Sequence, residues 1–280
     1  PDFVDGDGDA GDTADGVDQD GDGVVDELAG HGTFVAGMIR LVAPEARILP
    51  VRVLNDEGRG TGWPIIQGMF HAIDRGVEVI NVSIRSDYDV TAVKDAIAEA
   101  ESLGIVVVAA AGNFDLERRE YPAAFDQVLG VVALDELDRK AAFSSYNDDM
   151  FISAPGDTAF GGGVPDPARA IIGPRPGGGY AAWEGTSFAA PLVAGAAALV
   201  RGQHPEWPAA ASTAMQIRTR LAATAVDVSA QNPGYEPDVF GAGRMATGAA
   251  VALGPVAPPA GDLDGDGTVG FGDLTRLLAD

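Results

Sequence analysis

A serine at the head of a run of small residues is the first side chain in this sequence that could do chemistry. Ser187 follows the glycine at position 185, and the alanine-rich segment that continues through Gly195 predicts a helix. The first backbone N–H groups of a helix lack partners within it and lie at the positive end of its dipole. Such groups stabilise the negative charge that develops on an oxygen during acyl transfer. Ser187 is therefore the candidate nucleophile of an acyl-transfer reaction.

The same residues suggest two other interpretations. Small residues also let a helix pack tightly in a sheet protein, in which case Thr186 or Ser187 only caps the helix. The nucleophile elbow of the α/β-hydrolases needs the pattern G-x-S-x-G, but Ala189 occupies the position of its second glycine. A nucleophilic serine here therefore requires a different geometry, and it needs a base from elsewhere in the chain.

Histidine is the side chain best suited to supply that base. A serine hydroxyl is a weak nucleophile at neutral pH unless another group accepts its proton, and the ordinary pKa of histidine suits this task. The chain has three histidines. His71 falls in an amphipathic helical pattern and His204 precedes Pro205 at a predicted helix end, which favours structural roles for both. His31 stands among glycines and is the candidate general base.

Three segments together resemble the subtilisin-like serine proteases. Residues 30–38 match the family pattern around the histidine (HGTxVAG), and residues 184–195 match the pattern around the serine (GTSxAxPxVAG). Residues 106–113 resemble the family strand that ends in an oxyanion-hole asparagine. The resemblance implies that Asn113 donates its side-chain amide to the oxyanion, and in subtilisin itself such a donor contributes roughly 10²–10³ in kcat. The alternative for Asn113 is an ordinary turn after a buried strand.

The same resemblance implies where a substrate binds. A peptide is expected to add as an extended strand, with main-chain hydrogen bonds for affinity and pockets for selectivity. At position 85 the sequence departs from the family, in which Leu-Gly-Gly is common at 84–86, and this side chain either narrows the S4 region, attracts an acidic substrate side chain, or points into solvent. The residues that resemble the backbone-pairing segment are Ser83, Ile84 and Arg85; those that resemble the walls of the S1 pocket are Ala109, Ala110, Ala111, Gly112, Ser153, Ala154, Pro155 and Gly156.

One part of the family pattern is missing before His31. The family order is Asp, His, Ser, and no apolar strand ending in an aspartate precedes the histidine. Residues 1–3 resemble the segment that follows this aspartate. We therefore expect an N-terminally truncated piece of a longer precursor that is nearly inactive as it stands. In subtilisin, loss of this aspartate alone costs roughly 3 × 10⁴ in kcat. Removal of the preceding strand would also leave strand hydrogen-bonding groups without partners.

An acidic loop near the C-terminus predicts a calcium site. Carboxylate and hydroxyl oxygens occupy positions 1, 3, 5, 7 and 12 of an EF-hand-type loop, and a glycine at position 6 permits its sharp turn. The predicted ligands are Asp262, Asp264, Asp266, Thr268 and Asp273. The aspartate at position 12 and the leucines that follow resemble one dockerin type I repeat, of which the family normally has two. This implies a cohesin-type partner, and the alternative is a solvated acidic tail.

A second acidic loop, directly before His31, is a further candidate for calcium. Its oxygens occupy positions 1, 3, 5, 7 and 9 of the same type of loop, but Ala29 stands at position 12 and cannot coordinate a metal. A bound ion would order the start of the helix that carries the histidine; the alternative is a solvated loop. The predicted ligands are Asp18, Asp20, Asp22, Val24 through its carbonyl, and Asp26.

The hydrophobic periodicity predicts an α/β fold. Apolar runs at 46–54, 77–82 and 105–109 indicate strands, and amphipathic patterns between them indicate helices. Repeated β-α-β units predict a doubly wound, mostly parallel sheet flanked by helices, plus a small EF-hand-like appendage. We expect a peptidase domain at 1–254, a Pro-rich linker at 255–261 and a dockerin-like half repeat at 262–280.

Composition narrows the possible functions. The formal net charge of −24 argues against binding to nucleic acid or to an anionic membrane. The chain has no cysteine, which excludes disulfides and zinc-thiolate sites, and no apolar run is long enough to span a bilayer. We expect a monomeric, calcium-stabilised serine endopeptidase that acts on peptides or proteins, and the resemblance implies secretion or a cell-surface location. The alternatives are a protease-derived scaffold that binds peptides and a dockerin-bearing carrier.

Overall fold

A parallel sheet forms the centre of the molecule. The computed structural model describes residues 1–11, 14–18, 21–157 and 171–252. Its four-stranded sheet has the order β1-β2-β3-β4, and every neighbouring pair is parallel. The strands are β1 (Val79–Val82), β2 (Val106–Ala110), β3 (Val128–Leu134) and β4 (Ile152–Pro155). All residues of β2 and β3 are buried, as expected for continuous apolar runs in a sheet that is covered on both faces.

Helices cover both faces of this sheet. The helices are α1 (His31–Val42), α2 (Gly62–Asp74), α3 (Thr91–Ser102), α4 (Thr186–Gln203), α5 (Ala211–Thr224) and α6 (Thr247–Ala252), with short 3₁₀ turns η1 (Ser229–Gln231) and η2 (Pro237–Phe240). Alternate residues of β2 belong to two different core clusters: Val106 and Val108 pack with α1 and α4, whereas Val107 and Ala109 pack with α2 and α3. The predicted α/β fold with a parallel sheet flanked by helices is confirmed.

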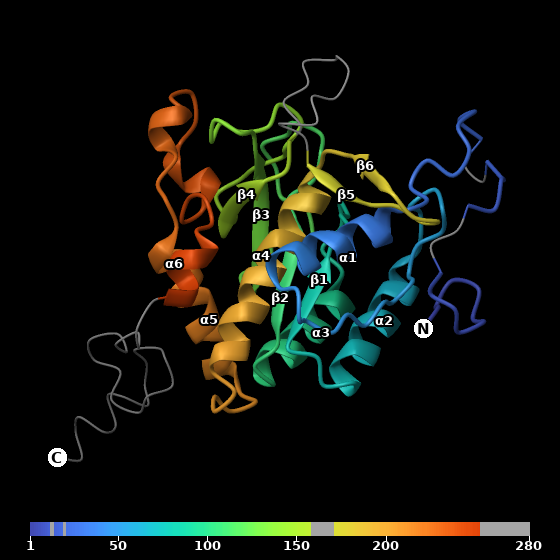
Figure 1. Cartoon of the computed structure of the whole chain (residues 1–280), viewed down its shortest axis with the longest axis horizontal. Helices are drawn as coiled ribbons and strands as arrows, with labels where there is room; N and C mark the ends of the chain where they lie inside the picture. The colour runs from blue at the N-terminus through green and yellow to red at the C-terminus, as the bar shows by residue number, and fades with distance from the viewer. Residues whose placement is uncertain (12–13, 19–20, 158–170, 253–280) are drawn as a thin grey trace.

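Helix α4 runs across one face of the sheet with α1 beside it (Figure 1). Of its 18 residues, 12 are buried, so the small-residue run does serve close packing. A Cβ atom built on Gly195 would lie 2.8 Å from the Val42 Cβ and 3.1 Å from the carbonyl oxygen of Ile39. The two helices therefore approach each other at a point where only glycine fits.

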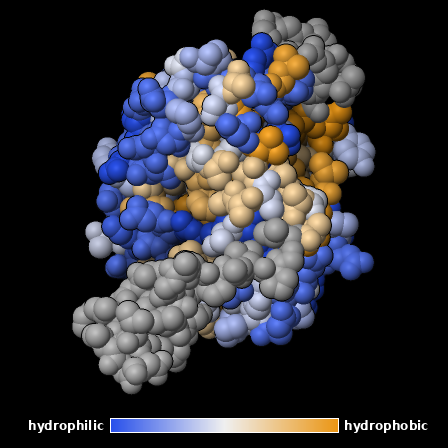
Figure 2. All heavy atoms as spheres, turned by 90° about the vertical axis from the view of Figure 1, so that its left-hand side faces the viewer, coloured by the Kyte–Doolittle hydropathy of each residue, from blue (hydrophilic) through white to orange (hydrophobic). Residues whose placement is uncertain are grey.

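A two-stranded antiparallel hairpin packs on the other side of α1. It consists of β5 (Ile172–Pro174) and β6 (Tyr180–Ala182). At Gly173 and Gly37 a Cβ atom would collide with Phe34 and Pro174, respectively, so the hairpin lies directly on the helix. The face that α5 and α6 form carries a pale, weakly hydrophobic area, with hydrophilic residues on its left and more strongly hydrophobic ones at its upper right (Figure 2). The pale area fits the alanine-rich sequences of these helices.

The predicted strand at 46–54 is wrong. This segment makes one isolated parallel bridge, between Asp2 and Arg52. The bridge consists of hydrogen bonds from Phe3 N to the Arg52 carbonyl (2.9 Å) and from Arg52 N to the Pro1 carbonyl (3.0 Å). A strand needs a continuous ladder of such bonds with a neighbouring strand. The apolar pattern at 46–54 does not reveal whether such a strand is present.

The predicted linker and dockerin-like half repeat lie outside the described residues. Within the ranges that the structure covers, no helix is both long and apolar enough to cross a bilayer.

Candidate active site

Ser187 lies in the first turn of α4, where the sequence predicts it. The preceding Gly185 has φ 150° and ψ 153°, and it is held by a hydrogen bond from its N–H to the Gly156 carbonyl (2.8 Å). A Cβ atom on Gly156 would lie 2.9 Å from the Gly185 carbonyl oxygen, so this contact also requires a glycine. The turn delivers a half-buried serine to the end of a helix whose remaining first-turn residues are buried.

The side chain of Asn113 is fixed beside this turn by Thr186. Its Oδ1 accepts hydrogen bonds from the Thr186 backbone N–H (2.9 Å) and from the Thr186 hydroxyl (2.8 Å). The same hydroxyl accepts a hydrogen bond from Gly112 N (3.1 Å). Because a backbone N–H can only donate, the amide oxygen of Asn113 must face Thr186 and its NH₂ group must face away from it. A Cβ atom built on Gly185 would lie 3.4 Å from that nitrogen, which places the NH₂ group at the serine turn.

His31 reaches the same turn from α1. It is the first residue of that helix, after Gly30 with φ 94° and ψ −8°. The imidazole ring lies 5.4 Å from the ring of Phe188 and 5.8 Å from the ring of Trp183, centroid to centroid. Phe188 directly follows Ser187 in the chain. These aromatic contacts therefore hold the half-buried imidazole against the first turn of α4.

Ser83, from the end of β1, contacts Ser187 through the backbone. The Ser83 hydroxyl donates to the Ser187 carbonyl oxygen (2.8 Å) and accepts a hydrogen bond from Asn81 Nδ2 (2.9 Å). No separate sequence signal marks Asn81, because an asparagine inside an apolar strand looks like an interruption. Its hydrogen bond to Ser83 explains its presence, because it orients the hydroxyl that donates to the Ser187 carbonyl oxygen.

Apart from Pro155, the half-buried last residue of β4, the remaining predicted pocket residues divide into two groups. Gly112 and Gly156 contact the Thr186 side chain and the Gly185 turn, as described above. Ala109, Ala110, Ala111 and Ala154 are packed in the core, with exposures of 0%, 3%, 1% and 0%. Ser153 is also fully buried, and its hydroxyl donates to the Phe240 carbonyl oxygen (3.0 Å). These buried side chains therefore support the site from within the core.

Arg85 does not point freely into solvent. Its Nη1 lies 2.5 Å from Asp87 Oδ1, and its guanidinium lies 4.1 Å from the ring centroid of Phe114. The stacking partner and the carboxylate hold this side chain along the surface, where 33% of it remains exposed.

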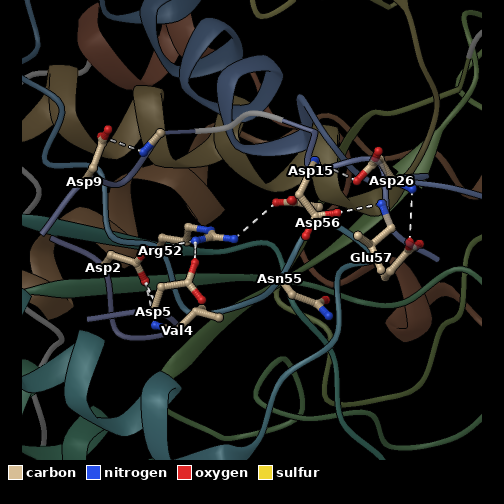
Figure 3. A network of polar contacts seen from close by, with 12 residues as sticks. Asp2, Val4, Asp5, Asp9, Asp15, Asp26, Arg52, Asn55, Asp56 and Glu57 are labelled. Carbon is tan, nitrogen blue, oxygen red and sulfur yellow. Dashed lines mark hydrogen bonds and ion pairs between the residues drawn. The ribbon is translucent and has the colours of Figure 1, made fainter. Parts of the chain in front are cut away.

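Carboxylates gather where the sequence predicts a metal loop, but in a different combination (Figure 3). One oxygen from each of Asp15, Asp26 and Asp56 lies within 4.8 Å of the others. The Asp26 carboxylate accepts hydrogen bonds from the N–H groups of Asp15 (3.0 Å) and Gly16 (2.9 Å). Of the predicted ligands, Asp26 belongs to this cluster.

Asp18 and Asp22 instead accept hydrogen bonds from their own loop. Gly21 N and Gly23 N donate to Asp18 (2.6 and 3.0 Å), and Val24 N donates to Asp22 (2.8 Å). Asp20 lies outside the described residues, as do Asp262, Asp264, Asp266, Thr268 and Asp273. The sequence pattern missed Asp15 and Asp56 because spacing within one loop cannot identify a partner from the distant segment around position 56.

Arg52 links this cluster to the first residues of the chain (Figure 3). Its guanidinium contacts Asp2 (2.8 Å), Asp56 (3.2 Å) and Asp5. Burial alone would raise the pKa of Asp2, but hydrogen bonds from Val4 N and Arg52 outweigh it and hold the pKa below its ordinary value. Burial raises the pKa of Asp56, Arg52 opposes this rise, and the nearby Asp15 and Asp26 add to it.

Known proteins share both the sequence and the fold. The family model described as "Subtilase family" matches residues 3–243 of this chain. Subtilisin DY of Bacillus licheniformis is 36% identical over 212 residues, which cover 71% of each chain. Subtilisin E of Bacillus subtilis (strain 168) is 38% identical over 208 residues, which cover 70% of this chain and 50% of the relative.

Two solved structures extend this similarity to the backbone. The crystal structure of a lanthipeptide protease has a TM-score of 0.69 at 28% identity and covers 79% of this chain and 74% of its own. The prenylagaramide maturation protease has a TM-score of 0.68 at 26% identity, with 80% and 82% covered. With its serine, histidine and asparagine gathered at one helix end, the chain belongs to the subtilase family and is a serine endopeptidase.

Proposed function

We propose that Ser187, His31 and Asn113 carry out peptide-bond hydrolysis. The Ser187 hydroxyl oxygen attacks the carbonyl carbon of the substrate, and His31 accepts the hydroxyl proton. The carbonyl oxygen becomes an oxyanion that accepts hydrogen bonds from Asn113 Nδ2 and the Ser187 N–H. His31 then gives the proton to the leaving amine. In the second half of the reaction, water attacks the acyl carbon with His31 as the base, and the acid product leaves as Ser187 regains its proton.

The observation that carries this proposal is the double anchoring of Asn113 Oδ1 by Thr186. An oxyanion hole works because its donors are already oriented before charge develops. Here the hydrogen bonds that orient the amide come from the residue directly before the nucleophile, so the donor and Ser187 form one rigid unit.

A fluorophosphonate probe tests the nucleophile. The wild-type chain is expected to label at one site, and Ser187→Ala to abolish labelling. Ser102→Ala, an exposed serine on α3, is the matched control and should label like the wild type. Absence of labelling in a folded wild-type chain that still binds peptides would contradict the proposal and favour a peptide-binding scaffold.

We also propose that the N-terminal acidic loop binds calcium. Three carboxylate oxygens that converge within 4.8 Å match the hard oxygen ligands that calcium prefers, and a divalent cation would relieve their mutual repulsion. Asp26 belongs both to this group and to the ligands predicted from sequence. When bound, the ion would tie residues 15–26 to the segment around Asp56 and stabilise the fold. Calcium should therefore raise Tm in the wild type and much less in Asp26→Asn.

The dockerin-like half repeat at 262–280 remains a proposal based on its sequence, with the linker at 255–261 as the domain boundary. Calorimetric titration of the full chain and of an Asp264→Asn, Asp266→Asn double variant with calcium tests it. Loss of one binding event in the variant supports the repeat, and an unchanged titration contradicts it. Secretion is proposed from the resemblance to subtilisins, and detection of the protein in culture medium tests that proposal.

A further inference from the structure

A buried glutamate lies between the two segments proposed to bind the substrate. Residues 83–85 and 110–112 continue from the C-terminal ends of the neighbouring parallel strands β1 and β2. Ser86 and Tyr121 form an antiparallel bridge, with hydrogen bonds of 2.7 and 2.8 Å, which brings Glu120 beside residues 85–87, and Arg85 Nε lies 3.9 Å from Glu120 Oε2. On its other side Glu120 packs against Gly112, where a built Cβ atom would fall 1.9 Å from Oε2. Only glycine at 112 permits this approach.

The two oxygens of Glu120 differ in their partners. The side chain is fully buried, with 0% exposure. Oε1 accepts a hydrogen bond from Arg118 Nε (3.1 Å), and the Ser145 hydroxyl lies 3.5 Å away. Oε2 accepts no hydrogen bond from any residue that the structure describes, and Arg85 Nε stands 3.9 Å from it. A buried carboxylate oxygen without a donor is costly, so its presence needs a reason.

The neighbouring arginines do not remove that need, because they are shared with another carboxylate. Arg85 Nη1 and Arg118 Nη2 both bind Asp87 Oδ1, at 2.5 and 2.8 Å. Arg85 is also stacked on Phe114. Two partly exposed cations thus divide their charge between Asp87 and Glu120, and Oε2 keeps its capacity to accept a further donor.

We propose that Glu120 selects substrates with lysine or arginine at P1, the residue that supplies the scissile carbonyl. This inference rests on the proposed function, because it places that carbonyl oxygen at Asn113. We place the P1 side chain along Gly112, which belongs to the segment that resembles the S1 wall, with its end at Glu120 Oε2. A cationic group there donates to Oε2, and an acidic P1 side chain is repelled.

Cleavage of tetrapeptide 4-nitroanilides that differ only at P1 tests this specificity. The wild type is expected to cleave the Arg and Lys peptides at least tenfold faster in kcat/KM than the Leu peptide, and the Glu peptide most slowly. Glu120→Gln should lower kcat/KM for the Arg peptide on the order of 100-fold and change the Leu peptide little. Glu117→Gln, an exposed site with the same loss of charge, is the matched control and should keep the wild-type preference.

A binding measurement separates this inference from the proposed mechanism. p-Aminobenzamidine carries an amidinium cation and reports binding by its fluorescence without any turnover. It should bind the wild type and Glu117→Gln and bind Glu120→Gln at least tenfold more weakly, with thermal unfolding confirming that each variant is folded. Lack of both peptide cleavage and fluorophosphonate labelling, with benzamidine binding retained, would refute the catalytic proposal alone. Equal cleavage of the Arg and Leu peptides, or benzamidine binding that is unchanged by Glu120→Gln, would overturn the role of Glu120.

Discussion

The first turn of α4 and the acidic N-terminal segment (residues 1–30) are both rich in polar groups, but different forces hold them. At the helix turn, Thr186 satisfies Asn113 through hydrogen bonds between neutral groups. In the N-terminal segment, Arg52 offsets carboxylates that repel one another. The first arrangement is rigid and independent of pH, whereas the second depends on protons and cations. The proposed catalytic groups therefore lie where the geometry is fixed, and the groups that respond to pH and cations lie in the N-terminal segment.

The largest effect is expected from Asn113→Ala. This variant removes the proposed oxyanion donor and should lower kcat by roughly 10²–10³, the range measured in subtilisin itself. KM should change little, because the donor acts mainly when negative charge develops. Steady-state kinetics with one peptide substrate measure both constants. A tenfold rise in KM with unchanged kcat would instead indicate that Asn113 only binds the substrate.

A smaller effect is expected from Thr186→Val, which preserves the shape of the side chain but removes its hydroxyl. Asn113 Oδ1 then loses one donor and Gly112 N loses its acceptor. We expect kcat to fall about tenfold and the free energy of unfolding to fall by about 1–3 kcal/mol. Thr186→Ser keeps the hydroxyl and should restore both values. Equal defects in the two variants would show that the methyl packing, and not the hydrogen bonds, supports the site.

Gly195→Ala tests the packing that supports both motifs. The added Cβ atom meets Val42 and the Ile39 carbonyl, so the unfolding free energy should fall by about 1–3 kcal/mol. Gly202→Ala, in the same helix with no atom within 4 Å, should instead stabilise the protein by about 0.5–1 kcal/mol. Chemical denaturation of the pair measures both. If Gly195→Ala and Gly202→Ala destabilised the protein equally, close packing of α1 against α4 would not be the cause of the loss in stability.

The smallest effects are expected from the acidic segment, and their signs differ. The pKa of Asp2 is lowered in the folded state, so its contribution to stability is present above its ordinary pKa and is lost as pH falls through the lowered value. The pKa of Asp56 is raised, so its charged form destabilises the fold at neutral pH, and this penalty disappears as pH falls through the raised value. Asp2→Asn should therefore cost about 1 kcal/mol at pH 7, whereas Asp56→Asn should be neutral or stabilising without calcium.

Denaturation curves between pH 3 and pH 7, with and without calcium, measure these contributions. The cost of Asp2→Asn should shrink toward pH 3, and the advantage of Asp56→Asn should vanish when calcium is added. If both variants lost stability equally at pH 7, the contrast between the two carboxylates would be refuted.

Sequence reasoning succeeded for features that depend on local pattern. Ser187 and His31 each lie in the first turn of a helix within a dense motif of small residues, and the alternation of apolar runs predicted the sheet that positions them. It failed where a contact joins distant segments. Asp15 and Asp56 lie close together although they are far apart in the sequence. No sequence motif around Glu120 indicates that its carboxylate is buried. The strand expected at 46–54 failed for the same reason, since a ladder requires a partner that local pattern does not reveal.

The burial of α4 has a consequence for how heat damages this protein. The helix that presents Ser187 is also the most buried of the described helices, with 12 of 18 residues buried. Partial unfolding of the core would therefore also displace Ser187 from His31 and Asn113. Loss of catalysis on heating should therefore coincide with loss of structure, without a partially melted species that still turns over substrate.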